Sequence, residues 1–218
     1  EGAERALAGR RIAWSATLGS ATVEPEVREI TERAAHVFAD LGCHVEAADP
    51  GFPDCHPILL PIYYSGLRAA LDGFLPTWRD RMDPGLVAAL DEHAGLTALD
   101  VGKATIARQA LSDTLRRFFD RYDLLLTPTM PLPAFPADLD RPRAVAGRPV
   151  RQLEWTPFTY PFNLTGVPAA TVPAGFTRDG LPVGLQIVGR RFADALVLQA
   201  SAAFEAARPW AHHRPPLD

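Results

Sequence analysis

The chain has 218 residues, of which 47% are hydrophobic, and this is enough to bury a core of its own. A net charge of −4 and the lack of a Lys/Arg-rich cluster exclude a typical nucleic-acid-binding surface. No apolar run is long enough to span a bilayer and no signal-peptide pattern is present, so we expect no membrane partner and a cytoplasmic location. Cys43 and Cys55 are too few for a disulfide framework, so both are expected as free thiols.

Residues 10–48 predict a strand–helix–strand unit. Short apolar strands are expected at residues 11–14 and 43–47. The helix between them should be capped by Thr22, carry Pro25 in its first turn and end at Gly42. A unit of this length predicts two parallel strands joined by a right-handed crossover, and therefore an α/β sheet.

Residues 57–121 are expected to be a helical segment. One helix should follow Pro61 and run to about residue 75, and a short one should open at Pro84. Thr97 with Asp100 three residues later resembles a capping box. The helix that begins there should be the longest of the chain and extend to about Arg121.

Residues 122–207 should contain a strand, a proline-rich loop, a hairpin and a final helix. Residues 122–130 read as a buried strand, and the prolines between positions 128 and 161 leave little room for regular structure. A long loop of this kind usually forms a wall or lid of a site. Asp194 is expected to cap a last helix that ends at Ala207.

The hairpin is predicted at residues 167–174 and 181–188, with a turn at residues 177–180 because Asp-Gly tolerates positive φ. Its second strand is apolar on both faces, so both faces should be covered by protein. Pro168 and Pro173 cannot donate to a ladder, which places them at strand ends or on an edge. Gln186 on this strand must find hydrogen-bond partners if it is buried, and bracing the backbone is favoured over contact with a substrate. The predicted fold class is α/β, a mixed β-sheet flanked by helices.

The order of these motifs resembles the C-terminal segment of the amidase signature family. The stretch NLTGVPAATVPAGF carries Asn163, Gly166 and Pro168, and GLPVGLQIVGRRF carries Gly184 and Gln186. We interpret these as structural motif residues. Residues 122–131 resemble the family's buried strand and its Pro-Thr-x-Pro loop, and residues 11–48 resemble its βαβ segment, so the likeness covers nearly the whole chain.

This resemblance implies an amidohydrolase that converts a small-molecule carboxamide to a carboxylate and ammonia or an amine. The family uses a serine nucleophile, a second serine and a lysine base, without a metal or an organic cofactor, and these residues precede the segment that this chain resembles. Here the only lysine is Lys103 and no Ser-Ser pair occurs. We therefore expect residues 1–218 to be the C-terminal portion of an amidase domain, with no catalytic residue in this chain and no activity of the chain alone.

Other catalytic sets are disfavoured by position. Lys103 at helical spacing from Asp100 reads as a solvated pair. Cys55 and His56 are adjacent, so their side chains point in different directions and a catalytic dyad is not expected. The His212-His213 pair lacks a third metal ligand at a suitable spacing.

Aromatic residues around Pro157 and Pro161 are the candidates for a substrate pocket. Trp155, Phe158 and Tyr160, with Tyr63 as a weaker candidate, could face the acyl or amine part of an amide. The alternative is that these rings pack the core beneath the loop.

Two rival functions remain open. A non-catalytic binding or assembly module could keep the fold without the chemistry. In the family's tRNA-dependent amidotransferase branch an acidic residue stands where this chain has Thr156, which argues against that branch, although Glu154 is close by. Apolar faces left uncovered in such a chain also predict self-association.

Overall fold

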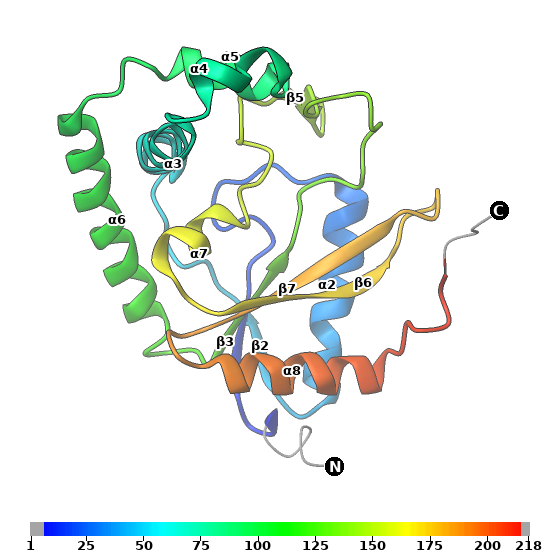
Figure 1. Ribbon diagram of the computed structural model, residues 1–218. Coiled ribbons are helices and arrows are strands. Elements are labelled where there is room, and N and C mark those ends of the chain that lie inside the picture. Colours follow the sequence, from blue (N-terminus) through cyan, green and yellow to red (C-terminus); the bar gives the residue numbers. More distant parts are fainter. Residues whose placement is uncertain (1–6, 215–218) are drawn as a thin grey trace.

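The computed structural model describes residues 7–214, so residues 1–6 and 215–218 of the predicted domain lie outside the described part. Its centre is a five-stranded sheet in the order β2-β1-β3-β7-β6 (Figure 1). β1 pairs in parallel with β2 and β3, whereas β7 is antiparallel to both β3 and β6. The sheet is therefore mixed, and the predicted α/β class is confirmed. The strands are β1 (Arg11–Trp14), β2 (His44–Ala47), β3 (Leu124–Pro128), β6 (Ala169–Phe176) and β7 (Pro182–Gly189).

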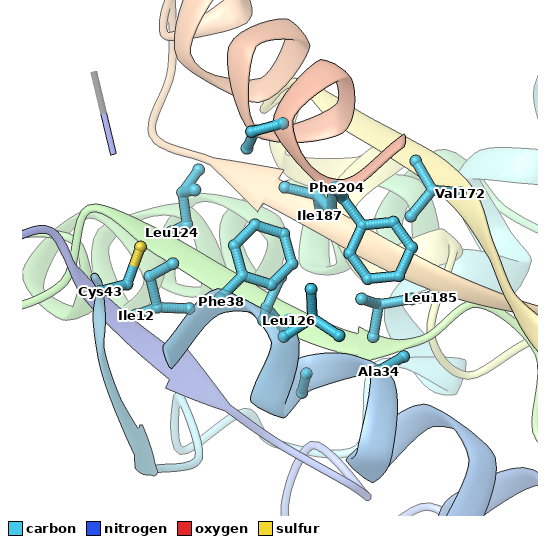
Figure 2. Packing of buried hydrophobic residues seen from close by; sticks show 14 of the residues in the cluster. Ile12, Ala34, Phe38, Cys43, Leu124, Leu126, Val172, Leu185, Ile187 and Phe204 are labelled. Atoms are coloured by element: carbon cyan, nitrogen blue, oxygen red, sulfur yellow. The ribbon is translucent and has the colours of Figure 1, made fainter. Parts of the chain in front are cut away.

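One face of the sheet is covered by helices α2 (Pro25–Asp40) and α8 (Asp194–Ala207). Figure 2 shows Phe38 of α2 beside Phe204 of α8, and their ring centroids lie 5.7 Å apart. Both rings belong to the core cluster that includes Leu126 and Ile187 of the sheet. Burial of these side chains removes apolar surface from water and fixes the two helices on the sheet.

The opposite face is covered by α6 (Ala98–Phe118) and α7 (Tyr160–Thr165). Here Phe118 and Phe162 pack with Leu125 and Val188, which alternate in sequence with the residues of the first face. Val183 to Gly189 of β7 are almost all buried, so the expectation that both faces of this strand are covered is correct.

The remaining helices lie outside this layer: α3 (His56–Leu71), α4 (Leu75–Trp78), a short 3-10 helix (Arg79–Arg81) and α5 (Pro84–Glu92). The prediction that the first of them follows Pro61 is wrong, because α3 begins five residues earlier and contains this proline. Its buried residues, among them Ile58 and Leu59 before the proline and Tyr64 after it, hold the helix together across the missing hydrogen bond.

The long helix α6 starts with the predicted capping box, in which the Thr97 side chain accepts a hydrogen bond from the Asp100 amide and Asp100 accepts one from the Thr97 amide. The predicted caps of the other two helices are wrong. The residue before α2 is Glu24, and Thr22 does not cap this helix. Glu24 accepts a hydrogen bond from the Ala146 amide at 2.6 Å instead of capping, and the residue before α8 is Ala193.

The proline-rich region is more regular than expected. Strands β4 (Ala144–Val145) and β5 (Arg148–Pro149) form a two-stranded ribbon, and α7 follows them. The hairpin β6–β7 has the predicted position, shifted by about two residues, and β6 is an edge strand with a register shift between Pro173 and Gly175. The edge location expected for Pro173 is thus confirmed. Within residues 7–214, no helix is long and apolar enough to cross a membrane.

Candidate functional site

An apolar pocket of about 420 Å³ lies where the hairpin β6–β7 meets the loop after β3. Met130 and Phe135 come from that loop, and Val172 and Val183 come from the two strands. Trp155 closes the pocket, and its ring stands edge-on to Phe135 with 5.3 Å between ring centroids. A pocket of this size and composition suits a small apolar group.

The other aromatic candidates do not share this pocket with Trp155. Phe158 is completely buried and packs between the sheet and helices α6 and α7. Tyr160 is buried against Cys55 and other apolar residues, and this burial raises the pKa of its hydroxyl. Tyr63 is exposed on α3, where its ring packs against Tyr64. The four rings therefore do not form one wall, because two of them are taken up by core packing.

A second, polar pocket of about 300 Å³ adjoins the first on the α7 side of the hairpin. It is lined by the hydroxyl groups of Thr129, Thr159 and Thr171 and by the amides of Asn163 and Gln186. The Gln186 amide nitrogen donates to Thr127 Oγ1 at 2.9 Å and to the Phe158 carbonyl at 2.7 Å. Gln186 thus braces the backbone beneath α7, as expected.

The remaining motif residues shape the backbone around these pockets. Gly166 ends α7 in a left-handed conformation with φ of 65°, which favours glycine. The Pro168 carbonyl accepts a hydrogen bond from the Gly189 amide at 3.0 Å. Gly184 lies beneath two hydroxyl groups, since a Cβ placed on it would lie 2.7 Å from Thr171 Oγ1 and 2.8 Å from Thr129 Oγ1.

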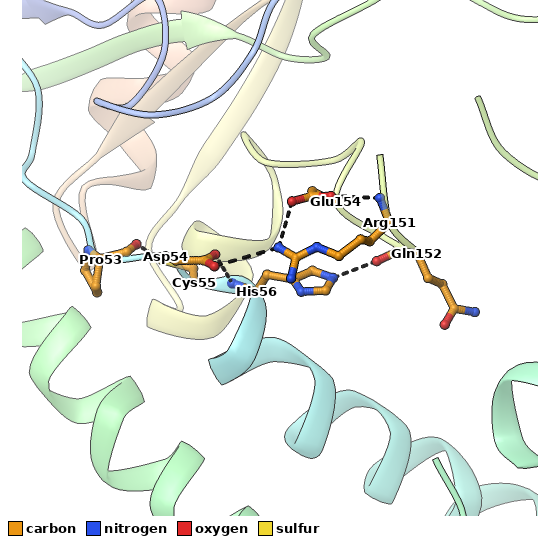
Figure 3. A network of polar contacts seen from close by, with 7 residues as sticks. All are labelled: Pro53, Asp54, Cys55, His56, Arg151, Gln152 and Glu154. Atoms are coloured by element: carbon orange, nitrogen blue, oxygen red, sulfur yellow. Dashed lines mark hydrogen bonds and ion pairs between the residues drawn. The ribbon is translucent and has the colours of Figure 1, made fainter. Parts of the chain in front are cut away.

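The segment that carries Trp155 is tied to the N-terminal end of α3 by a polar network (Figure 3). His56 Nε2 lies 2.7 Å from the Gln152 carbonyl. Arg151 donates to Glu154 at 2.7 Å and lies 3.9 Å from Asp54. The hydrogen bond from Arg151 holds the pKa of Glu154 below its usual value. Glu154 is therefore engaged by an arginine of its own loop.

The alternative catalytic residues have no reactive arrangement. Cys55 donates to the Pro53 carbonyl at 3.3 Å, and burial raises the pKa of its thiol to about 12. The imidazole of His56 is bonded to Gln152, so the two residues form no thiolate–imidazole pair. Lys103 is exposed on α6, and Asp100 belongs to the capping box. Among residues 7–214, no group of three or more His, Cys, Asp or Glu side chains is placed to hold a metal ion.

Sequence reasoning missed the hydroxyl groups of Thr129 and Thr171, which line both pockets. Each is a polar residue within an otherwise apolar motif, Pro-Thr-x-Pro and Ala-Ala-Thr-Val-Pro, and that contrast was the available signal. Their proximity depends on the pairing of β3, β7 and β6, which sequence spacing does not reveal.

Comparison with known proteins gives consistent matches. The family model described as Amidase matches residues 1–198. An acylamidase of Rhodococcus erythropolis is 41% identical over 214 residues, which cover 95% of this chain and 44% of that protein. A glutamyl-tRNA(Gln) amidotransferase chain of Moorella thermoacetica is 32% identical over 224 residues, which cover 90% of this chain and 44% of the relative.

Among solved structures, a bacterial aryl acylamidase described as belonging to the amidase signature enzymes superposes with a TM-score of 0.83 at 31% identity. The superposition covers 94% of this chain and 46% of the other. A second structure, described as an amidase, gives a TM-score of 0.81 at 25% identity and covers 91% and 46% of the two chains. The chain thus spans somewhat less than half the length of these relatives.

Proposed function

This chain belongs to the amidase signature family, and from this we propose that it forms part of an amidohydrolase that converts a linear carboxamide to a carboxylate and ammonia or an amine. The family match over residues 1–198 is the observation that carries the proposal. The superposition on an aryl acylamidase and the apolar pocket beside Trp155 support it.

In this proposal the chain is the C-terminal portion of the enzyme, and the serine, serine and lysine residues of the reaction lie in a segment that precedes it. The hydroxyl groups of Ser65, Ser112 and Ser201 each donate to a carbonyl of their own helix, and Lys103 is exposed on α6. None of them forms the serine–lysine pair that the chemistry needs. The match to less than half of each relative is consistent with this division.

The reaction itself follows from the groups that the family supplies. A neutral lysine removes a proton through the second serine, the first serine attacks the amide carbon, and the amine leaves with that proton. Water then hydrolyses the acyl-enzyme and releases the carboxylate. The contribution of this chain is to shape the pocket for the apolar part of the substrate, with Trp155 as one wall.

Ammonia release from a panel of aliphatic and aromatic primary amides tests this proposal. The 218-residue chain and a version extended by its upstream coding sequence are compared under the same conditions. We expect hydrolysis by the extended protein alone. Hydrolysis by the short chain would contradict the proposed division and direct attention to Lys103, Cys55 and His56.

A second candidate is a component of an amidotransferase, which the similarity to the Moorella thermoacetica protein favours. Thr156 stands where the acidic residue of that branch is expected, and its hydroxyl donates to the Leu153 carbonyl at 2.7 Å. Glu154, the nearby acid, is engaged by Arg151. Co-purification of the extended protein with a partner that delivers ammonia would favour this candidate over an independent amidase.

A further inference from the structure

Thr129 and Thr171 meet at the boundary between the apolar and the polar pocket, and they line both of them. Their hydroxyl oxygens lie 2.6 Å apart, although the residues are 42 positions apart in sequence. Neither residue is buried, so a ligand in either pocket can reach the pair. The two pockets are therefore continuous with one polar point between them.

The pair is held in place by the sheet. The Thr129 amide donates to the Gly184 carbonyl at 2.9 Å, and Thr171 is opposite Gln186 in the register of β6 and β7. The space over Gly184, which a Cβ would fill, is occupied by both hydroxyl groups. A hydroxyl pair fixed by backbone pairing needs little reorganisation to bind a ligand.

The chemistry of the pair selects the ligand. Two hydroxyl groups carry two protons, and the hydrogen bond between them uses one. The other proton remains as a donor, while lone pairs on both oxygens remain as acceptors. A carboxamide offers a carbonyl acceptor and an N–H donor, so it matches this pattern. A carboxylate has no donor and satisfies only half of it.

We propose that the Thr129–Thr171 pair binds the carboxamide group of a ligand whose apolar aryl or acyl group occupies the pocket beside Trp155. This inference rests on the proposed function for the class of ligand, and on the two pockets for its orientation. It makes Thr129 and Thr171 residues that favour an uncharged amide over the acid formed from it.

Binding of phenylacetamide, phenylacetate and toluene to the chain, followed through backbone amide NMR shifts, tests the proposal. We expect shifts in residues 129–135 and 169–184, with phenylacetamide binding more tightly than phenylacetate. Thr171→Val keeps the shape of the side chain and suits a strand, and it should weaken phenylacetamide binding by about 3- to 10-fold. Toluene, which lacks the carboxamide, should bind this variant as it binds the wild type.

Two further variants make the test specific. Thr114→Val removes a hydroxyl on α6 that donates to the Ala110 carbonyl, away from both pockets, and should leave all three affinities unchanged. Trp155→Ala should weaken phenylacetamide and toluene alike. Equal phenylacetamide affinity in Thr171→Val and wild type, or shifts confined to another part of the chain, would overturn the proposal.

This measurement does not depend on hydrolysis. If the pair binds phenylacetamide but the extended protein hydrolyses no amide, the proposed function fails and the binding site stands. If the extended protein is active and Thr171→Val changes neither its KM nor the binding of the short chain, the binding site fails and the proposed function stands.

Discussion

Gly184 shows at the scale of one residue how the hairpin and the threonine pair depend on each other. A methyl group at this position would meet both threonine oxygens at less than 3 Å, and these atoms are held by a strand and by the β3 loop. We predict that Gly184→Ala lowers the free energy of unfolding by about 1–3 kcal/mol, because the side chains must move apart. Urea denaturation monitored by circular dichroism measures this change.

Gly102 provides the matched control. It lies within α6, is exposed, and has no heavy atom within 4 Å of the position that a Cβ would take. Gly102→Ala should therefore stabilise the protein, by about 0.5–1 kcal/mol, through its helix propensity. If both alanine variants change stability in the same direction, the crowding over Gly184 is not what decides its effect.

Cys55 is expected to be chemically inert despite its neighbouring histidine. With a pKa raised to about 12 by burial, only about 10⁻⁴ of this thiol is ionised at pH 8, against roughly a quarter of an ordinary thiol. Cys43 is also buried, and burial raises its pKa as well. We predict that neither thiol reacts with an aromatic disulfide reagent within an hour at pH 8, and that both react at once in 6–8 M urea as the protein unfolds. Rapid reaction of one thiol in the folded protein would show that it is accessible as a nucleophile.

At the scale of an element, the capping box determines where α6 begins. Thr97→Ala removes the hydroxyl that accepts from the Asp100 amide and donates to the Asp100 carboxylate at 2.6 Å. We expect a loss of about 1 kcal/mol in the free energy of unfolding at pH 7. Thr105→Ala, which removes a hydroxyl from the same helix without touching its cap, should change stability much less.

The effect of Thr97→Ala should depend on pH with a definite sign. Hydrogen bonds from Thr97 lower the pKa of Asp100, so the ionised carboxylate stabilises the fold above the usual pKa of aspartate. This stabilisation is lost as the pH falls through the lowered value. The difference between wild type and Thr97→Ala should thus shrink in acid, and a difference that grows there would contradict this explanation.

For the whole molecule, exposed apolar residues lead us to predict self-association. Ile106 on α6, Phe192 before α8 and Leu198 on α8 are all well exposed, and Phe192 is 84% accessible. The edge strand β6 contributes less, because Pro173 lacks an N–H and the register shift interrupts its ladder. Light scattering at micromolar concentrations should give a mass above that of one chain, and Phe192→Ser should reduce it relative to Tyr63→Ser. A monomeric wild type would exclude this prediction.

Local patterns were sufficient for much of the fold. The helix at residues 98–118 followed from its capping box and apolar spacing, and the hairpin followed from its Asp-Gly turn and two apolar runs. The start of α3 was wrong because proline penalties are local, whereas burial of Ile58 and Leu59 is a tertiary effect. The caps of α2 and α8 were wrong because Glu24 bonds to a distant loop and Ala193 caps without a side-chain bond.

The sequence by itself determined the family resemblance, the mixed α/β class and the lack of a serine–lysine pair in this chain, because these depend on residue identity and short-range order. Only the tertiary structure decided which aromatic ring faces a pocket, since Trp155 and Phe158 differ by three positions yet one lines a pocket and the other is buried. It also decided that Thr129 and Thr171 share a hydrogen bond, because strand register brings together residues whose separation along the chain carries no information about their distance in space.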